Sequence, residues 1–256
     1  MECLLIMKKM PCLIVFNYLE NKPTSSIKPE CSWVFDGDAV ASIKWDGTSC
    51  LIMGGKLFKR YGAKVKRNLL AKYASGEIDF SLDILDKSPI DAIPCQEFAD
   101  KKTGHYPMWV MCDKDSPSDK YHFEGLSKLD LSTIPDGTTL ELIGEKVGAN
   151  PHNIKGHEFK IHGADVVDVG SSLCDLINWL IKNNQEGLVF KNKVDGRMCK
   201  FRRSDITRQC HKDEVDELIS KYRLNRPPKS GLLNISDFKR WNILEDDDFD
   251  KTLLKS

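Results

Sequence analysis

Residues 39–61 read AVASIKWDGTSCLIMGGKLFKRY, and this stretch decides the fold class that the sequence predicts. It holds three apolar, strand-like runs, which are separated by the polar triplet DGT and by Gly54-Gly55. A two-residue Gly-Gly link between such runs is typical of a β-hairpin. We therefore expect consecutive antiparallel strands here, with Lys44 near the end of the first one.

The strand pattern returns in the second half of the chain. It is visible in TTLELIG (138–144) and in EFKIHGADVVDV (158–169). Two further runs, EGLVFKN (186–192) and RMCKFRR (197–203), follow closely on one another. Since a turn at Asp195-Gly196 joins these two runs, we expect a second antiparallel pair.

One amphipathic helix is predicted just before this last pair. Ser171 or Ser172 caps its start, because a serine hydroxyl can accept from a free backbone N–H of the first turn. Its apolar face is formed by Leu173, Leu176, Ile177, Leu180 and Ile181. Antiparallel strands mixed with helices predict an α+β fold in which sheets are flanked by helices.

The chain is expected to divide into three parts. Residues 1–32 form an N-terminal strand and lead-in segment, and residues 33–210 form the main domain. Within that domain, residues 77–125 show no sustained period, which predicts an ordered insertion or long loops. Residues 211–256 form a Pro-containing extension with a short helix, whose apolar stripe is Val215, Leu218, Ile219 and Tyr222.

Composition excludes some classes of protein. The 256 residues carry 38 Lys and Arg against 38 Asp and Glu, so a wholly basic nucleic-acid coat is excluded. A balanced total still permits a local basic groove. The nine cysteines are scattered without a CxxC pair, which favours reduced thiols and an intracellular protein, cytoplasmic or nuclear.

Membrane insertion and secretion are not expected. The apolar N-terminal run is interrupted by Lys8 and Lys9, and no small-residue cleavage site follows it. No run approaches the roughly 20 apolar residues that span a bilayer. The sequence thus predicts a soluble protein without a membrane partner, and we expect a monomer.

The segment Lys44-Trp45-Asp46-Gly47-Thr48 carries the first sign of chemistry. A lysine between a strand and a tight turn can present its amine as a nucleophile to a phosphorus atom. By itself the motif is weak evidence, because an ordinary hairpin with a surface lysine fits it equally well.

Companion motifs give this lysine a context. Five segments resemble, in the same order, the motifs of the covalent nucleotidyltransferases, the superfamily of ATP-dependent ligases and capping enzymes. They are KWDGT (44–48), KRYG (59–62), LELIG (140–144), EGLVFK (186–191) and CKFRR (199–203).

Further segments resemble the 5′-to-3′ RNA ligases of the vertebrate RNA ligase 1 type. The similarity runs roughly from residue 36 to residue 203, and it implies a ligase-type nucleotidyltransferase domain. Only 53 residues follow Arg203, too few for a separate oligonucleotide-binding barrel. The segments are IPCQ (93–96), TGHYPMW (103–109), KYHFEGL (120–126), GANP (148–151) and HGA (162–164).

The resemblance implies roles for the acidic and basic residues. Lys44 would attack the α-phosphate of ATP and become a lysyl-AMP, and Lys200 would neutralise the charge that develops on that phosphate. Glu186 and Asp46 would bind Mg²⁺, for which Mn²⁺ can substitute, with Glu186 favoured. Glu141 would accept hydrogen bonds from the ribose hydroxyls.

Other residues are assigned to the nucleotide and to RNA. Arg60 would contact the ribose or an RNA phosphate, because a guanidinium grips phosphate oxygens with two bonds. Arg202 and Arg203 are both candidates for the RNA 5′-phosphate, and strand alternation places Arg202 with Lys200, which favours it. Gly47 lies in KWDGT, and the resemblance assigns it to nucleotide binding.

Two positions depart from the patterns of related enzymes. Ile43 replaces the acidic residue often found before the lysine in related RNA ligases, so adenine would be read partly by backbone groups. Position 49 is Ser, where DNA ligases and capping enzymes usually carry Arg, which leans towards RNA ligases.

The predicted function is ATP-dependent joining of RNA 5′-phosphate and 3′-hydroxyl ends through an adenylylated RNA end. A DNA ligase or a capping guanylyltransferase is the nearest alternative. A non-catalytic module that binds RNA ends or nucleotides is a further one.

Four more residues carry side chains that can bind a metal or a base. His152, His157 and His162 recur every five residues, a spacing that fits neither a helix face nor a strand face, so we interpret them as non-ligands. Phe159 could stack on adenine, but packing in the core is favoured.

Overall fold

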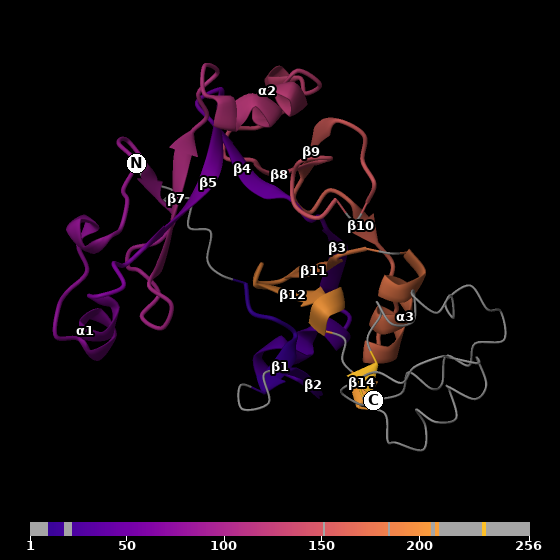
Figure 1. The fold of residues 1–256 in the computed structure, drawn as a ribbon. Coiled ribbons are helices and arrows are strands. Elements are labelled where there is room, and N and C mark those ends of the chain that lie inside the picture. The colour runs from indigo at the N-terminus through magenta and orange to yellow at the C-terminus, as the bar shows by residue number, and fades with distance from the viewer. Residues whose placement is uncertain are drawn as a thin grey trace, which may run out of the picture. The chain divides into compact units, whose positions relative to one another are not determined.

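The computed structural model describes residues 10–17, 22–150, 152–183, 185–205, 208–209 and 232–233 (Figure 1). They belong to two compact units. Unit 1 contains Asp46–His162, and unit 2 contains Met10–Trp45 and the described residues from Gly163 onwards. The chain therefore passes from unit 2 to unit 1 between Trp45 and Asp46, inside the KWDGT segment.

Unit 1 is built on a six-stranded antiparallel sheet of order β6-β7-β5-β4-β8-β9 (Figure 1). Gly54 and Gly55, at φ 57° and 67°, form the turn between β4 and β5, which confirms the predicted hairpin. The strands are β4 (Thr48–Met53), β5 (Lys56–Lys64), β6 (Ile93–Pro94), β7 (His105–Met111), β8 (Thr139–Gly144) and β9 (His157–Ile161).

Short helices cover parts of this sheet. Helix α2 (Lys120–Leu126) packs against β9 and against a cluster that includes Cys50, Leu140 and Leu142. Helix α1 (Leu70–Ser75) contributes Tyr73 to a second cluster with Tyr106 and Met108. The 3-10 turns of this unit are η2 (Leu82–Ile84), η3 (Pro117–Asp119) and η4 (Leu131–Thr133).

The segment 77–125 contains more regular structure than its sequence indicated. It supplies β7, which lies between β6 and β5 inside the sheet, and it supplies α2. Residues Tyr106 to Trp109 of β7 are all buried. A strand buried on both faces has no polar-apolar alternation, and so period-2 analysis does not detect it.

Unit 2 contains a four-stranded antiparallel sheet of order β10-β3-β11-β12. One face of it carries the core, which α3 (Leu173–Asn183) and the 3-10 helix η1 (Pro29–Phe35) cover. The strands are β3 (Ala39–Lys44), β10 (Val166–Val167), β11 (Gly187–Asn192) and β12 (Met198–Arg202). Buried core side chains include Trp33, Leu176, Leu180, Leu188, Phe190 and Phe201.

Ser172 caps α3. It is one of the two serines, Ser171 and Ser172, that the sequence offered for this position. The Asp175 N–H donates to Ser172 Oγ (3.2 Å), and the Ser172 N–H donates to Asp175 Oδ2 (3.0 Å). This reciprocal pair satisfies donors that the first turn of a helix would otherwise leave free.

The N-terminal segment pairs with the last strand of this sheet. Leu13 N donates to Lys200 O (2.7 Å), and Lys200 N donates to Pro11 O (3.0 Å). Beyond it, β1 (Ile14–Asn17) and β2 (Lys22–Ile27) form a hairpin, so the predicted N-terminal strand is present from Ile14. Its residues 1–9 lie outside the described part of the chain.

Two short strands complete the described structure. β13 (Arg208–Gln209) pairs with β14 (Leu232–Leu233), a pairing that the sequence did not indicate. A 3-10 turn, η5 (Arg203–Asp205), follows β12. The predicted C-terminal helix with Val215 and Tyr222 lies outside the described residues.

The chain is thus a mixed α+β protein with antiparallel sheets and few helices, as the strand pattern predicted. The described strands form open sheets, and none of these closes into a barrel. Among the residues described, no helix has the length and apolar character needed to cross a membrane. The two units divide the segment 33–210 that the sequence analysis treated as one domain.

Candidate active site

One face of the unit 2 sheet gathers three cations, Lys44 of KWDGT and both Lys200 and Arg202 of CKFRR. Gly187 on β11 pairs with Lys44 on β3 and, on its other side, with Arg202 on β12. Val189, two residues further along β11, pairs with Lys200. Side chains of directly paired and of alternate residues point to the same face, so these three cations share the face opposite the core.

The register explains why the core lies on the other face. Leu188 and Phe201 are paired neighbours, and both are at most 1% exposed. Lys200 and Arg202 flank Phe201 in β12 and are only half-buried. The alternation predicted for CKFRR is therefore confirmed. A Cβ on Gly187 would lie 2.5 Å from the Phe201 carbonyl oxygen, so glycine permits the close approach of β11 and β12 between Lys44 and Arg202.

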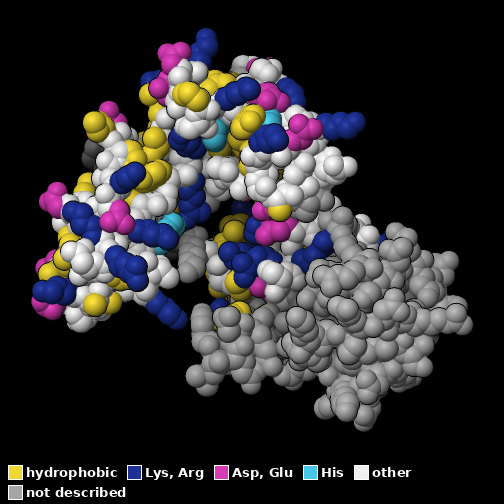
Figure 2. Space-filling model, viewed as in Figure 1, with side chains coloured by type: hydrophobic (Ala, Val, Ile, Leu, Met, Phe, Trp, Pro, Cys, Tyr) yellow, Lys and Arg dark blue, Asp and Glu magenta, His cyan; other side chains and the backbone are white. Residues whose placement is uncertain are grey.

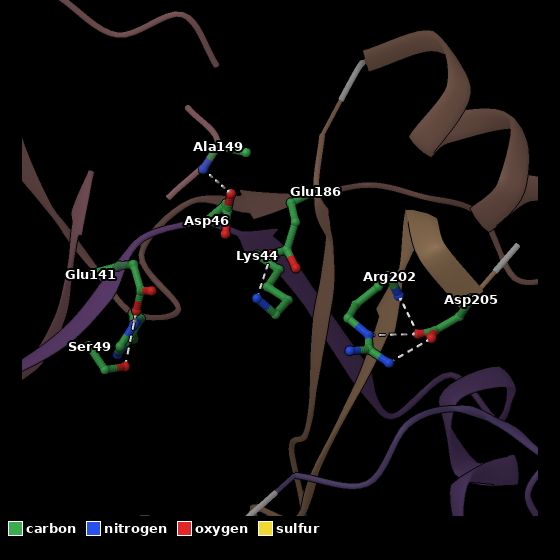
Figure 3. Close-up of polar contacts among 9 residues, drawn as sticks. Lys44, Asp46, Ser49, Glu141, Ala149, Glu186, Arg202 and Asp205 are labelled. Atoms are coloured by element: carbon green, nitrogen blue, oxygen red, sulfur yellow. Dashed lines mark hydrogen bonds and ion pairs between the residues drawn. The ribbon is translucent and has the colours of Figure 1, made fainter. Parts of the chain in front are cut away.

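Lys44 forms an ion pair with Glu186 (Figure 3). Glu186 immediately precedes β11, so the pairing of Gly187 with Lys44 brings its carboxylate to the amine. Both side chains are 23% exposed, which leaves the pair open to solvent and to a ligand.

Lys44 and Arg202 each have a carboxylate partner, and Lys200 differs from them. Among the described residues it has no ion-pair partner, although it is half-buried beside Lys44 and Arg202. Burial lowers the pKa of Lys200, and the two neighbouring cations lower it further. A partly buried cation without a counterion is a favourable place for an anion.

Arg202 is held by Asp205 in η5 (Figure 3). Its Nε and Nη2 donate to the two carboxylate oxygens at 3.2 and 2.8 Å, and Asp205 is only 6% exposed. This fork fixes the direction of the guanidinium. Arg202 Nη2 also lies 3.5 Å from the Cys12 sulfur. Cys12 thus belongs to the surroundings of the cations, a contact that no motif indicated.

Arg203 occupies a different environment. It lies beyond β12, where its N–H donates to the Glu186 carbonyl (2.8 Å). Its Nε and Nη2 are buried and have no hydrogen-bond partner among the described residues. Burial lowers the pKa of the Arg203 guanidinium. Of the two arginines, Arg202 is therefore the one on the face of Lys44 and Lys200.

The end of β3 is anchored by Asp165. The Trp45 indole donates to Asp165 Oδ2 (2.8 Å), and the Ile43 N–H donates to Asp165 O (3.0 Å). The N–H of Ile43 is accordingly engaged within the protein. Lys44 lies between these two anchored residues, which restricts the backbone from which its side chain extends.

Unit 1 carries a second polar group, centred on Glu141 of β8. Ser49 is paired with Glu141 across β4 and β8, and its hydroxyl donates to Glu141 Oε2 (3.0 Å; Figure 3). His162 Nε2 lies 2.8 Å from the same oxygen, and His162 Nδ1 lies 3.0 Å from Thr139 Oγ1. No pattern in the sequence indicated this contact of His162 with Glu141.

Arg60 extends the same row of residues. Cys50 pairs with Lys59, so Ser49 and Arg60 are the next residues along β4 and β5, and Arg60 pairs with Trp109 of β7. On the face of unit 1 that Figure 2 shows, Lys and Arg side chains are mixed with Asp and Glu, in keeping with the balanced total charge.

Asp46 and Gly47 have structural tasks within unit 1. Asp46 Oδ2 accepts the Ala149 N–H (3.1 Å; Figure 3). A Cβ on Gly47 would lie 2.0 Å from the Leu142 carbonyl oxygen, so only glycine permits this approach of the chain to β8. Asp46 thereby links the KWDGT segment to the segment around GANP.

The remaining ligand candidates pack inside unit 1. Phe159 packs against the cluster beneath α2, which confirms its assignment to the core. His157 stacks on Tyr121, with ring centroids 4.1 Å apart, and its Nδ1 lies 2.9 Å from Glu124 Oε2. Within the described residues there is no group of three or more His, Cys, Asp or Glu side chains arranged to hold a metal.

No protein-family model matches the chain, and no curated protein matches it either.

Proposed function

We propose that the protein is an ATP-dependent RNA ligase that joins RNA 5′-phosphate and 3′-hydroxyl ends. The observation that carries the proposal is the cationic face of unit 2, where Lys44 and Arg202 pair with Gly187 from either side and Lys200 pairs with Val189. Three cations against the carboxylates of Glu186 and Asp205 leave one excess positive charge, which suits a phosphate chain.

The first step would use Lys44 as the nucleophile. Its Nζ attacks the α-phosphorus of ATP, an N–P bond forms, the bond to the β-phosphate oxygen breaks, and pyrophosphate leaves. Glu186 is the group that holds the amine before the reaction. In this proposal Glu186 releases the amine when the nucleotide binds, so that Lys44 can act as the nucleophile.

Lys200 and Arg202 would bind the phosphates in the later steps. An RNA 5′-phosphate oxygen attacks the lysyl-AMP phosphorus and releases Lys44, and an RNA 3′-hydroxyl then displaces AMP to close the strand. Arg202 is oriented by Asp205 through Nε and Nη2, and its Nη1 would contact a phosphate. Lys200, which has no counterion among the described residues, would neutralise charge in each transfer.

The nucleoside is assigned to residues of unit 1 by the resemblance. Glu141 would accept hydrogen bonds from ribose hydroxyls, and Arg60 would contact the ribose or an RNA phosphate. The row that contains Arg60, Ser49 and Glu141 on adjacent strands supports a common ligand for these residues. Strands lie about 4.8 Å apart, so the row spans the width of a sugar and a phosphate.

Mg²⁺ fits the donor chemistry at Glu186. Mg²⁺ prefers oxygen ligands and is usually held by one or two carboxylates together with substrate phosphates. Glu186 offers a partly exposed carboxylate, whereas Asp46 already accepts the Ala149 N–H. When bound, the cation would neutralise phosphate charge and polarise the P–O bonds.

Covalent labelling tests the proposal. The protein is incubated with Mg²⁺ and α-³²P-labelled ATP or GTP and run on a denaturing gel, beside Lys44→Ala. We expect label from ATP, no label in Lys44→Ala, and chase of the label onto 5′-phosphorylated RNA but not DNA. Label from GTP would favour capping chemistry instead, chase onto DNA would favour a DNA ligase, and no label from either nucleotide would favour a binding module.

A further inference from the structure

We infer that His162 is a positioning residue that orients Glu141 and thereby sets the preference for ribonucleotides over deoxyribonucleotides. The inference rests on the proposed function, because it takes Glu141 as the group that meets the ribose. It adds a residue, His162, and a property, sugar selectivity, to that function.

Both donors to Glu141 bind the same oxygen. Ser49 Oγ donates to Oε2 at 3.0 Å, and His162 Nε2 lies 2.8 Å from Oε2. Among the described residues, Oε1 has no hydrogen-bond partner, while the side chain as a whole is only 12% exposed. A carboxylate held by one oxygen presents the other in a fixed direction, and a hydroxyl group of a ligand is the donor that suits it.

His162 is itself held in place by β8. Its N–H donates to the Thr139 carbonyl (3.1 Å), and its Nδ1 lies 3.0 Å from the Thr139 hydroxyl. A neutral imidazole with its proton on Nε2 satisfies both contacts, because Nδ1 then accepts from the hydroxyl and Nε2 donates to Glu141. Thr139 and Glu141 are two residues apart in one strand and so point to the same face.

This arrangement predicts what happens when the imidazole is removed. Glu141 would keep its charge and the bond from Ser49 but would gain rotamers, so that a ligand must order the carboxylate on binding. The loss should fall on substrates that carry the hydroxyl read by Oε1. Substrates that lack this hydroxyl gain nothing from an ordered carboxylate and should be affected little.

The experiment measures covalent AMP formation with ATP, 2′-deoxy-ATP and 3′-deoxy-ATP. The variants are His162→Ala, His162→Gln, whose amide nitrogen can replace Nε2 as a donor, and Glu158→Gln as a control. Glu158 lies on β9 and forms an ion pair with Lys160 (3.0 Å). For each protein, kcat and KM are determined for all three nucleotides, and circular dichroism checks that the variants fold.

In the native protein we expect one deoxy analogue to be used about 10- to 100-fold less well than ATP, since a hydrogen bond to a charged group is lost. His162→Ala should reduce this discrimination to about threefold or less, mainly through a higher KM for ATP. His162→Gln should keep most of the discrimination, and Glu158→Gln should keep all of it.

Two different failures can be told apart. If the native protein forms no AMP adduct with ATP, the proposed function is wrong. If it forms the adduct but His162→Ala discriminates between ATP and both deoxy analogues as the native protein does, the inference about His162 is overturned while the ligase proposal stands. Equal loss with all three nucleotides in His162→Ala and His162→Gln would also overturn it, because that pattern indicates a merely structural role.

Discussion

Lys44 and Arg202 are the two cross-strand partners of Gly187, one on each side of β11. They come from segments that are more than 150 residues apart in the chain, yet they lie about two strand spacings, roughly 10 Å, from one another. No side chain stands between them on the sheet. This shared face is the basis of the first prediction below, which depends on the proposed function.

The two arginines of CKFRR should differ in their effect on RNA joining. Arg202→Ala removes a guanidinium from the face of Lys44, so transfer of AMP to 5′-phosphorylated RNA should fall about 100-fold. Arg203→Ala should lower that rate much less, because Arg203 lies beyond the strand with two buried nitrogens. Single-turnover transfer from preformed lysyl-AMP to RNA measures both. A larger loss in Arg203→Ala would reverse the assignment.

Glu186→Gln should alter the dependence on Mg²⁺. The amide keeps the size of the side chain but loses the charge that binds Lys44 and, in our proposal, the cation. The Mg²⁺ concentration for half-maximal AMP formation should rise about 10- to 100-fold. Titration of AMP formation with Mg²⁺ checks this, with Asp195→Asn as a control on an exposed carboxylate. Removal of Mg²⁺ by EDTA should stop labelling of the native protein; unchanged Mg²⁺ dependence in Glu186→Gln would contradict the assignment.

Gly47→Ala should destabilise unit 1 by about 2 kcal/mol or more. The added Cβ meets the Leu142 carbonyl at 2.0 Å, and a backbone atom in a paired strand cannot move aside cheaply. Gly62→Ala is the matched comparison, since its nearest neighbour is the end of the His105 side chain at 2.8 Å, which can rotate. Urea denaturation should place Gly62→Ala within about 1 kcal/mol of the native protein. Equal losses in both variants would count against the close approach.

Stability should fall as the pH drops below about 6.5, and His122 in α2 should be a cause. Burial lowers the pKa of His122, whereas nearby Asp119 raises it and Lys59 lowers it. The unfolded chain therefore takes up the proton at a higher pH than the folded protein, so stability present above the usual histidine pKa is lost on acidification. Uptake of one proton changes the free energy of unfolding by at most about 1.4 kcal/mol per pH unit.

The His122→Leu variant tests this origin of the pH dependence. Both ring nitrogens of His122 are buried without a hydrogen-bond partner among the described residues, so leucine sacrifices no hydrogen bond. Urea unfolding at pH 7.5 and pH 5.5 should show a smaller loss of stability in the variant than in the native protein. Identical losses would mean that other groups are responsible. Asp119 titrates below this range, because Lys59 and other donors hold its pKa below the usual value.

Local sequence patterns predicted a turn, a helix cap and a strand pair of the fold correctly. The Gly54-Gly55 hairpin, the serine cap of α3 and the pairing of β11 with β12 follow from short-range chemistry that neighbouring residues supply. Strand β7 was not foreseen, because burial on both faces erases its alternation. The pairing of β13 with β14 joins segments more than 20 residues apart and left no local signal.

For the candidate site, the sequence by itself determined which residue types stand in which motif, and the alternation of CKFRR fixed that Lys200 and Arg202 share a face. Strand alternation is a property of the local backbone and needs no partner. Only the tertiary structure decided that Gly187 lies between Lys44 and Arg202. It also decided that Arg202 contacts Asp205 and Cys12. The contact of His162 with Glu141 likewise appears only in the folded chain. These contacts depend on sheet register, and register is set by burial of whole faces rather than by any single motif.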